Sequence, residues 1–257
     1  MAASSSWIRN FLILLVLVHR VFGACKNCYT VSRASYYGTV TNDLGSPNGS
    51  CGYGSFGQSL NGGDVSAASS KLYRSGMGCG ACYQVRCGNE DLCSDDGVKV
   101  VVTDMGEGDG TDLIMTRHAF SQLGLDQSSS DQLLAMGTVT VLYRRVSCVY
   151  TGKNLMVKID ESSNNPSYLA FLFYYQAGSK DISAVNVCET RNLECKLRTQ
   201  TRGALWEVVI PPKGSLSIRL LVTDSDSGQE QWITFANVIP TNWQPGALYD
   251  SGIQLDS

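Results

Sequence analysis

Four acidic side chains lie close together in the middle of the chain, at Asp104, Glu107, Asp109 and Asp112. They occupy a glycine-rich segment that directly follows the valine-rich run at 98–102, whose alternation predicts a β-strand. A strand that delivers carboxylates onto a loop is a common way to build a polar cleft. Near a sugar ring, such carboxylates can act as general acid, general base or hydrogen-bond acceptor. The alternative is a solvent-exposed acidic turn, because glycine and aspartate are ordinary turn residues.

The overall composition limits the class of protein that can hold these acids. The chain has 257 residues, a net charge of −3 and only 17% charged residues. A surface that tracks phosphates needs a basic excess, so nucleic acid is not expected as a partner. The length allows two modest domains, and the many short polar residues favour a β-rich protein with frequent turns.

The N-terminus has the features of a secretory signal. Arg9 precedes an unbroken apolar run at 11–18, and cleavage is expected after Gly23 or Ala24. The predicted signal peptide is therefore 1–24. The apolar run is too short to span a bilayer, although an uncleaved anchor is the alternative. No other stretch reaches membrane-spanning length, so a secreted, extracellular protein without membrane attachment is predicted.

Ten cysteines follow the predicted cleavage site, and an even number in a secreted chain predicts disulfides. The spacing lets Cys87 and Cys93 close a tight loop on each other, and Cys188 and Cys195 bracket a second loop. Two Cys-x2-Cys pairs, at 25–28 and 79–82, could instead be halves of a zinc site, but the oxidising compartment favours disulfides. No metal site and no cofactor are predicted. Asn48 begins an N-glycosylation sequon.

Two domains are predicted from the order of the elements. In the first half, strands are expected at 34–38, 79–87, 97–102 and 137–146, with a helix at 116–123 that begins after Thr116, and at most a short helix at 65–72. The pattern changes near 151–154. After this point, strands are expected at 155–159, 168–175, 182–187, 205–210, 218–223 and 232–238. Their spacing is typical of an all-β sandwich. The expected domains are 25–150 and 151–257.

Six motifs together resemble one known family, the plant expansins. They are SYYG at 35–38, CGYG at 51–54, GCGACYQVRC at 78–87, VTD at 102–104, VLYRRV at 141–146 and NWQPG at 242–246. The match covers nearly all of the mature chain. The missing His-Phe-Asp motif and the extra N-terminal cysteines are most similar to the expansin-like B subfamily.

The resemblance implies a mainly β fold. The first domain is expected to be a six-stranded double-psi β-barrel, similar to family-45 endoglucanases. The second is expected to be an immunoglobulin-like β-sandwich, similar to a carbohydrate-binding module. The family pattern implies the disulfides Cys51–Cys79, Cys82–Cys148 and Cys87–Cys93, which leaves Cys25–Cys28 and Cys188–Cys195.

The resemblance also implies a function, because expansins loosen plant cell walls without measurable hydrolysis. Asp104 matches the acid at the end of the VTD strand, and Asp112 matches the acid of the His-Phe-Asp motif. Tyr37 matches the cleft tyrosine, and Ser35 stands where the family usually has threonine. These four residues are the predicted polysaccharide-binding residues of the first domain. The histidine and phenylalanine of the motif are replaced by glycine and threonine at 110 and 111.

The same comparison argues against an enzyme. Glycoside hydrolysis needs an acid and a second carboxylate. Asp112 could be the acid, and Asp104 could hydrogen-bond it or a sugar hydroxyl. The acid usually found before the CGYG motif is replaced by Ser46 or Pro47, with Asp43 the nearest carboxylate. No well-placed base is visible, so Asp112 and Asp104 are predicted to be vestigial rather than catalytic.

In the second domain, a glycan platform needs aromatic faces on one exposed sheet surface. Tyr168 matches a binding aromatic of the family, and a second family aromatic falls near Arg202. Trp206 is close by and is kept as a further binding candidate, with core packing as the favoured alternative for it and for Trp232 and Trp243. The side chains at 171, 173 and 175 are expected to face the core.

The predicted function is that of a secreted cell-wall protein, expected to be a monomer, whose partner is cell-wall polysaccharide, either cellulose or a matrix glucan or xylan. Non-hydrolytic wall loosening is the associated activity. Two alternatives remain: a weak glycoside hydrolase, and a structural or defence protein that kept the scaffold and lost the groove.

Overall fold

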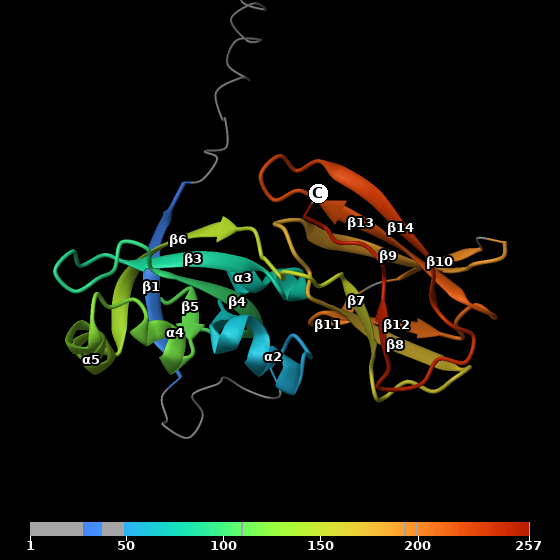
Figure 1. Ribbon diagram of the computed structural model, residues 1–257, viewed down its shortest axis with the longest axis horizontal. Helices are drawn as coiled ribbons and strands as arrows, with labels where there is room; N and C mark the ends of the chain where they lie inside the picture. Colours follow the sequence, from blue (N-terminus) through green and yellow to red (C-terminus); the bar gives the residue numbers. More distant parts are fainter. Residues whose placement is uncertain (1–27, 38–48, 109, 193, 199, 257) are drawn as a thin grey trace, which may run out of the picture.

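Two β-rich bodies lie side by side along the long axis of the computed structural model (Figure 1). The structure describes residues 28–37, 49–108, 110–192, 194–198 and 200–256. The predicted signal peptide, Cys25, the Asn48 sequon and Asp109 lie outside the described residues.

The first body is a closed six-stranded barrel with the strand order β1-β5-β2-β4-β3-β6. Its strands are β1 (Thr30–Tyr36), β2 (Val65–Ala68), β3 (Cys82–Cys87), β4 (Val98–Met105), β5 (Leu113–Met115) and β6 (Thr138–Val146). β1 pairs in parallel with β5, and β2 with β4, whereas the other pairs are antiparallel. Alternating side chains fill the barrel, because successive residues of a strand point to opposite faces.

Four short α-helices connect and cover the barrel strands: α2 (Ser55–Ser59), α3 (Ser70–Tyr73), α4 (Arg117–Ser121) and α5 (Gln127–Met136). α4 begins where the sequence predicts, because the Thr116 side chain accepts a hydrogen bond from the Ala119 amide at 3.2 Å. Phe120 of this helix is fully buried in the barrel core. α4 thereby seals one side of the barrel.

The expected helix at 65–72 is wrong for its first half, which forms strand β2. All four residues of β2 are buried, because the strand pairs with β4 on one side and β5 on the other. Its alanines favour a helix, and the pairing with β4 and β5 overrides that local preference. Helix α5 and the three-residue strand β5 were also absent from the sequence prediction, since neither has a clear apolar period.

The second body is a sandwich of two antiparallel sheets. One has the order β10-β9-β13-β14, and the other has the order β11-β12-β8-β7-β15. The strands are β7 (Met156–Ile159), β8 (Tyr168–Tyr174), β9 (Asp181–Glu189), β10 (Cys195–Arg198), β11 (Gln200–Arg202), β12 (Leu205–Val209), β13 (Leu216–Thr223), β14 (Glu230–Ile239) and β15 (Leu248–Asp250). The six predicted runs correspond to β7, β8, β9, β12, β13 and β14. Phe171 and Phe173 point into the core between the sheets, as the alternation predicts. The prediction is wrong for Tyr175, which follows the end of β8 with a positive φ of 59° and contacts Phe56 and Tyr150 instead.

Four disulfides lie within the described residues: Cys51–Cys79, Cys82–Cys148, Cys87–Cys93 and Cys188–Cys195. Three of them hold the barrel, and the fourth links β9 to β10. They are the pairs that the family pattern and the loop spacing imply. The expected partner of Cys28, Cys25, lies outside the described residues.

The two bodies meet through an aromatic cluster. Phe56 of α2 stacks on Tyr174 of β8, with ring centroids 3.6 Å apart and an angle of 10° between the planes. Tyr53 meets Tyr174 edge-on at 6.1 Å. Tyr174 belongs to the outer face of its sheet, so this face is covered by the barrel at one end of β8.

Ion pairs reinforce the same junction. Asp181 of β9 is only 8% exposed and accepts from two barrel arginines, Arg74 at 2.7 Å and Arg145 at 3.2 Å. A buried carboxylate with two charged donors has a fixed position. The junction therefore sets where the barrel cluster of acids lies relative to the sandwich.

Candidate functional site

Asp112 stands at the end of the Gly-rich loop and is held by hydroxyl groups from two directions. Its Oδ1 accepts from the Ser69 hydroxyl at 2.8 Å, and its Oδ2 accepts from the Tyr143 hydroxyl at 2.9 Å. The ammonium of Lys71 lies 3.6 Å from Oδ2. Side chains from three other segments thus converge on this one carboxylate: the start of α3, strand β6 and, through Ser32, strand β1.

These contacts decide the protonation state of Asp112. Partial burial opposes ionisation, but the hydrogen bonds from Ser69, Ser32 and Tyr143 and the charge of Lys71 together hold the pKa below its usual range. A catalytic proton donor needs the opposite, a raised pKa that keeps its proton near neutral pH. Asp112 is therefore arranged to accept hydrogen bonds as a carboxylate.

The lowered pKa of Asp112 predicts a pH dependence of stability. A carboxyl group whose pKa is lower in the folded chain stabilises it fully above the unfolded pKa, which is 3.8, and loses this contribution as the pH falls through the folded value. Replacing Asp112 with asparagine removes this pH-dependent contribution to the free energy of unfolding. We expect wild type to be more stable than Asp112→Asn near pH 6, with the difference shrinking between about pH 5 and pH 2.

Urea unfolding of both proteins across this range measures the effect. Asp126→Asn is the comparison variant. Hydrogen bonds from Ser129 lower the pKa of Asp126 as well, so its stability difference from wild type should also shrink as the pH falls, at a place away from the site. A difference between wild type and Asp112→Asn that stays constant with pH would contradict the assignment.

Asp104 forms a second cluster at the end of β4. Its Oδ1 accepts from the amides of Ser50 and Met105 at 2.6 and 2.7 Å. Tyr37 and Tyr73 lie close enough that the charge of Asp104 adds to burial in raising the pKa of each phenol. Within the described residues, no hydrogen bond joins Asp104 to Asp112, so of the two roles open to Asp104 the direct link to Asp112 is not seen.

A pocket of about 650 Å³ opens beside Asp104, at the junction with the sandwich. It is lined by Ser50, Tyr73 and Met105 from the barrel and by Arg202 from β11. Tyr73 and Arg202 line the same pocket, and the positive charge of Arg202 partly offsets the rise in the pKa of Tyr73 that burial and Asp104 cause. The pocket thus combines glycine backbone, an aromatic ring and hydrogen-bonding groups from both bodies.

Ser35 takes a different position from the other predicted residues. It is half-buried in β1, between Ile114 of β5 and Thr138 of β6. Its neighbour Ala34 points into the barrel core, so Ser35 points to the opposite face. Within the described part of the chain, no hydrogen bond connects Ser35 to Asp104 or Asp112.

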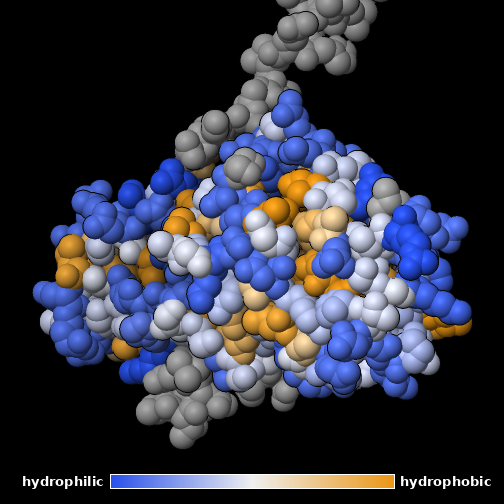
Figure 2. Space-filling view, turned by 45° about the vertical axis from the view of Figure 1, so that its right-hand side comes forward, coloured by the Kyte–Doolittle hydropathy of each residue, from blue (hydrophilic) through white to orange (hydrophobic). Residues whose placement is uncertain are grey.

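Tyr168 begins β8 on the outer face of its sheet. Its cross-strand partner Val209 is 67% exposed, and Tyr168 itself is half-buried beside Glu207. Burial and the nearby charge of Glu207 raise the pKa of its phenol. Ala170 and Leu172 share this face but are buried. Figure 2 shows strongly hydrophobic residues in small, separate groups on the face in view.

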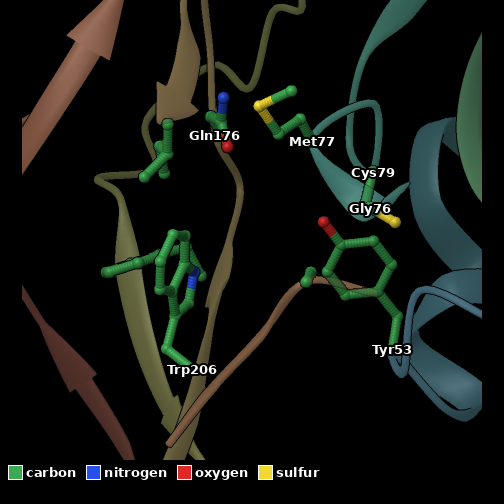
Figure 3. Close-up of a pocket in the computed structure, with 9 residues that line it drawn as sticks. Tyr53, Gly76, Met77, Cys79, Gln176 and Trp206 are labelled. Carbon is green, nitrogen blue, oxygen red and sulfur yellow. The ribbon is translucent and has the colours of Figure 1, made fainter. Parts of the chain in front are cut away.

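Trp206 is not placed to bind a glycan, which corrects its inclusion as a binding candidate. It is 4% exposed and belongs to the core between the two sheets. Figure 3 shows it across a small cavity of about 20 Å³ from Tyr53 of the barrel. Trp243 is also core, at 3% exposed, but Trp232 is 42% exposed, so the core expectation is wrong for Trp232.

Several residues of the site were not singled out by the sequence. Ser69, Lys71 and Tyr143 hold Asp112, and Tyr73 lies beside Asp104. Tyr143 lies in the VLYRRV motif, which marks β6 but does not say what its phenol contacts. These residues come from strands and turns far from Asp112 in sequence, so only the closed barrel brings them together.

Neither a membrane-spanning helix nor a metal cluster was found in the part of the chain that the structure describes. No helix there is long and apolar enough to cross a bilayer. No group of three or more histidine, cysteine, aspartate or glutamate side chains there is placed to hold a metal ion.

Comparison with known proteins gives two family matches. A family model described as Expansin C-terminal domain matches residues 155–240, and the DPBB_1 model, described as Lytic transglycolase, matches residues 65–143. The chain is 52% identical over 229 residues to an expansin-like B1 of Oryza sativa subsp. japonica, with 88% of each chain covered. It is 45% identical over 224 residues to an expansin-like B1 of Arabidopsis thaliana, with 87% of this chain and 88% of that protein covered.

Two solved structures share the fold. The apo expansin of Clavibacter michiganensis superposes with a TM-score of 0.64 at 20% identity, covering 88% of this chain and 97% of that one. A mutant of the same bacterial protein in complex with cellohexaose gives a TM-score of 0.62 at 20% identity, covering 86% and 95%. The likeness confirms the barrel followed by a β-sandwich.

Proposed function

The chain belongs to the plant expansin family, and we propose on this basis that it is a secreted cell-wall protein that binds neutral wall polysaccharide without hydrolysing it. The ligand is cellulose or a matrix glucan or xylan. The site runs from the Asp112 and Asp104 clusters of the barrel, through the junction pocket, to Tyr168 on the sandwich.

One observation carries the non-hydrolytic part of the proposal: both carboxylate oxygens of Asp112 accept hydroxyl hydrogen bonds, beside a lysine. This arrangement favours the ionised form, so Asp112 lacks the proton that a glycosidic oxygen would need. A carboxylate with a fixed orientation still accepts hydrogen bonds from sugar hydroxyls. Asp112 would thus hold a glycan by accepting a hydrogen bond from a sugar hydroxyl in place of one from Ser69 or Tyr143, and it would donate no proton.

The binding part rests on the junction and on family membership. Tyr73 of the barrel and Arg202 of the sandwich line one pocket, next to the Ser50 and Met105 amides that Asp104 accepts from, so a chain bound there would contact both bodies. Tyr168 lies six residues along β8 from Tyr174, or about 20 Å from that junction residue. A polysaccharide, rather than a small sugar, has the length to reach both. The related bacterial expansin is known in complex with cellohexaose.

The test combines wall extension with binding. Isolated, heat-inactivated plant walls are held under constant load, the purified protein is added, and reducing sugar is assayed in the same bath. We expect extension without sugar release, lost in Asp112→Asn. Binding to insoluble glucan should weaken by about three- to tenfold in Tyr168→Ala, because one aromatic stacking contact is lost.

A matched control is Trp232→Ala, which removes an exposed aromatic from the opposite sheet and should bind like wild type. Sugar release by wild type would replace the proposal with a glycoside hydrolase. Unchanged glucan binding in the double variant Asp112→Asn, Tyr168→Ala would favour a structural or defence protein that kept only the scaffold.

A further inference from the structure

A cluster of cations stands on the outer surface of the barrel, away from the Asp112 and Asp104 clusters. Three neighbouring strands contribute one each: Lys99 from β4, Arg86 from β3 and Arg144 from β6. The strand registers place Gln84 directly between Lys99 and Arg144, and residues that oppose each other across strands share a face. Arg86 follows two residues after Gln84 and therefore points to the same face.

Apolar side chains are interleaved with these cations. Leu142 lies between Arg86 on one neighbouring strand and Val31 on the other, and Val31 is 68% exposed. Tyr29, just before β1, contacts both arginines: the guanidinium carbons of Arg144 and Arg86 lie 4.9 and 5.3 Å from the centre of its ring. We call these six residues, Lys99, Arg86, Arg144, Tyr29, Leu142 and Val31, the basic barrel face.

The geometry of the basic barrel face is organised by hydrogen bonds. Gln84 Oε1 accepts from the Tyr29 hydroxyl at 3.0 Å and from Arg144 Nε at 2.9 Å. Gln84 in turn donates through Nε2 to the main-chain oxygen of Asp96 at 2.9 Å. The ring and one guanidinium are thus held in place before any ligand arrives, which lowers the entropic cost of binding.

Within the described residues, the recorded contacts of these cations are with uncharged groups: Lys99 donates to the Ser147 main-chain oxygen at 3.3 Å, Arg144 donates to Gln84, and both arginines contact Tyr29. None of the ion pairs there involves Lys99, Arg86 or Arg144. The Nε of Arg86 is buried and has no hydrogen-bond partner among the described groups. The hydrogen bond between Asp96 and Gln84 uses the main-chain oxygen of Asp96 and not its carboxylate. Two guanidinium groups held against one ring repel each other, and a bound anion would relieve that repulsion.

The combination of charge and apolar surface selects the class of ligand. Guanidinium groups match the geometry of carboxylates, whereas the exposed Val31 and its neighbour Leu142 offer apolar contact to the C–H face of a sugar ring. We propose that the basic barrel face is a second carbohydrate site, which binds an acidic polysaccharide built from uronic-acid sugars. This site is separate from the neutral-glycan site proposed above and does not depend on it.

The overall charge of the protein is opposite in sign to that of the basic barrel face. The chain carries a net charge of −3, which repels a polyanion at long range. Binding of a polyuronate would therefore have to come from the local cluster rather than from general attraction. It would also weaken with salt, because the cations are near the surface and the Debye length shortens from about 14 Å at 0.05 M to about 4 Å at 0.5 M.

The experiment measures binding of the mature protein to soluble oligogalacturonate in calcium-free buffer by titration calorimetry. The test variant is Arg86→Gln with Arg144→Gln. The control is Lys213→Gln with Arg219→Gln, which removes the same charge from the sandwich. We expect the test variant to lose about tenfold or more in affinity and the control to change by less than about twofold. The test variant should still bind neutral glucan like wild type.

Two comparison ligands are tested on the wild-type protein alone, so these measurements do not depend on whether a variant folds. Methyl-esterified oligogalacturonate keeps the sugar rings but removes the charge, and it should not bind measurably. Poly-glutamate keeps the carboxylates without the rings, and it should bind at least about tenfold more weakly. Equal losses in the test and control variants, or retained binding of the methyl ester, would overturn the proposal. Equal affinity for poly-glutamate would mean that this face binds any polyanion, which also overturns it.

Tyr168→Ala separates the two proposed sites. It should weaken binding to neutral glucan and leave oligogalacturonate binding unchanged. A loss of both by this single change would show one shared site and would contradict the assignment of the basic barrel face.

Discussion

Replacing Trp206 with alanine is expected to lower the free energy of unfolding of the sandwich by about 3–5 kcal/mol, the usual cost of removing a buried tryptophan side chain. The ring is 4% exposed and lies in the core beside Phe171 and Val208. The change would also enlarge the small cavity between Trp206 and Tyr53 (Figure 3). The loss therefore combines missing apolar burial with an unfilled space at the domain junction.

Urea unfolding followed by circular dichroism measures this effect. Trp232→Ala is the matched control, since Trp232 is 42% exposed and its ring contacts the Arg219 guanidinium at 5.1 Å. We expect the control to cost no more than about 1 kcal/mol. Similar losses in the two variants would contradict the different burial of the two rings. A glycan-binding defect in Trp206→Ala without lost stability would restore Trp206 as a binding residue.

Removing the Cys82–Cys148 disulfide is expected to destabilise the barrel by about 4 kcal/mol, because the bond closes a loop with a sequence separation of 66 residues. Closing a long loop restricts the unfolded chain more than closing a short one. The bond also joins β3 to the segment after β6. There, Cys148 exchanges two main-chain hydrogen bonds of 2.9 Å with Gly178 of the second body. Its loss would loosen the barrel at the domain junction.

The comparison is a double serine variant of Cys87 and Cys93, whose sequence separation is only 6, for which the same chain-entropy argument gives about 2 kcal/mol. Guanidinium unfolding of both double variants under matched conditions shows which disulfide contributes more to the free energy of unfolding. A larger loss from the short loop than from the long one would contradict loop closure as the source of stability.

The sequence predicted the class of fold because β-strands have a local signature. Alternating apolar residues identified β4, β6 and most strands of the sandwich, and Thr116 marked the start of α4. The sequence missed β2, whose alanines and serine have no alternation. This strand exists because β4 and β5 hydrogen-bond to it from both sides, which is information from distant parts of the chain.

The candidate site was predicted less completely than the fold. Asp104, Asp112 and Tyr37 were found because they lie in or beside family motifs. The partners that hold Asp112, Ser69 and Tyr143, were not, because hydrogen bonding between distant segments leaves no period in a sequence. The three tryptophans show the same limit: alternation assigns residues to two faces but does not say which face another layer will cover.

By itself, the amino-acid sequence determined what short-range patterns can encode: the secretory signal as a prediction, an oxidised set of cysteines, two β-rich parts, and motifs that assign the family. The tertiary structure alone decided which side chains meet. It brought Ser69, Lys71 and Tyr143 to Asp112, buried Trp206 while exposing Trp232, and gathered three cations on the outer barrel surface. The physical reason is that pairing and packing join residues far apart in the chain, and these contacts set burial, charge and pKa.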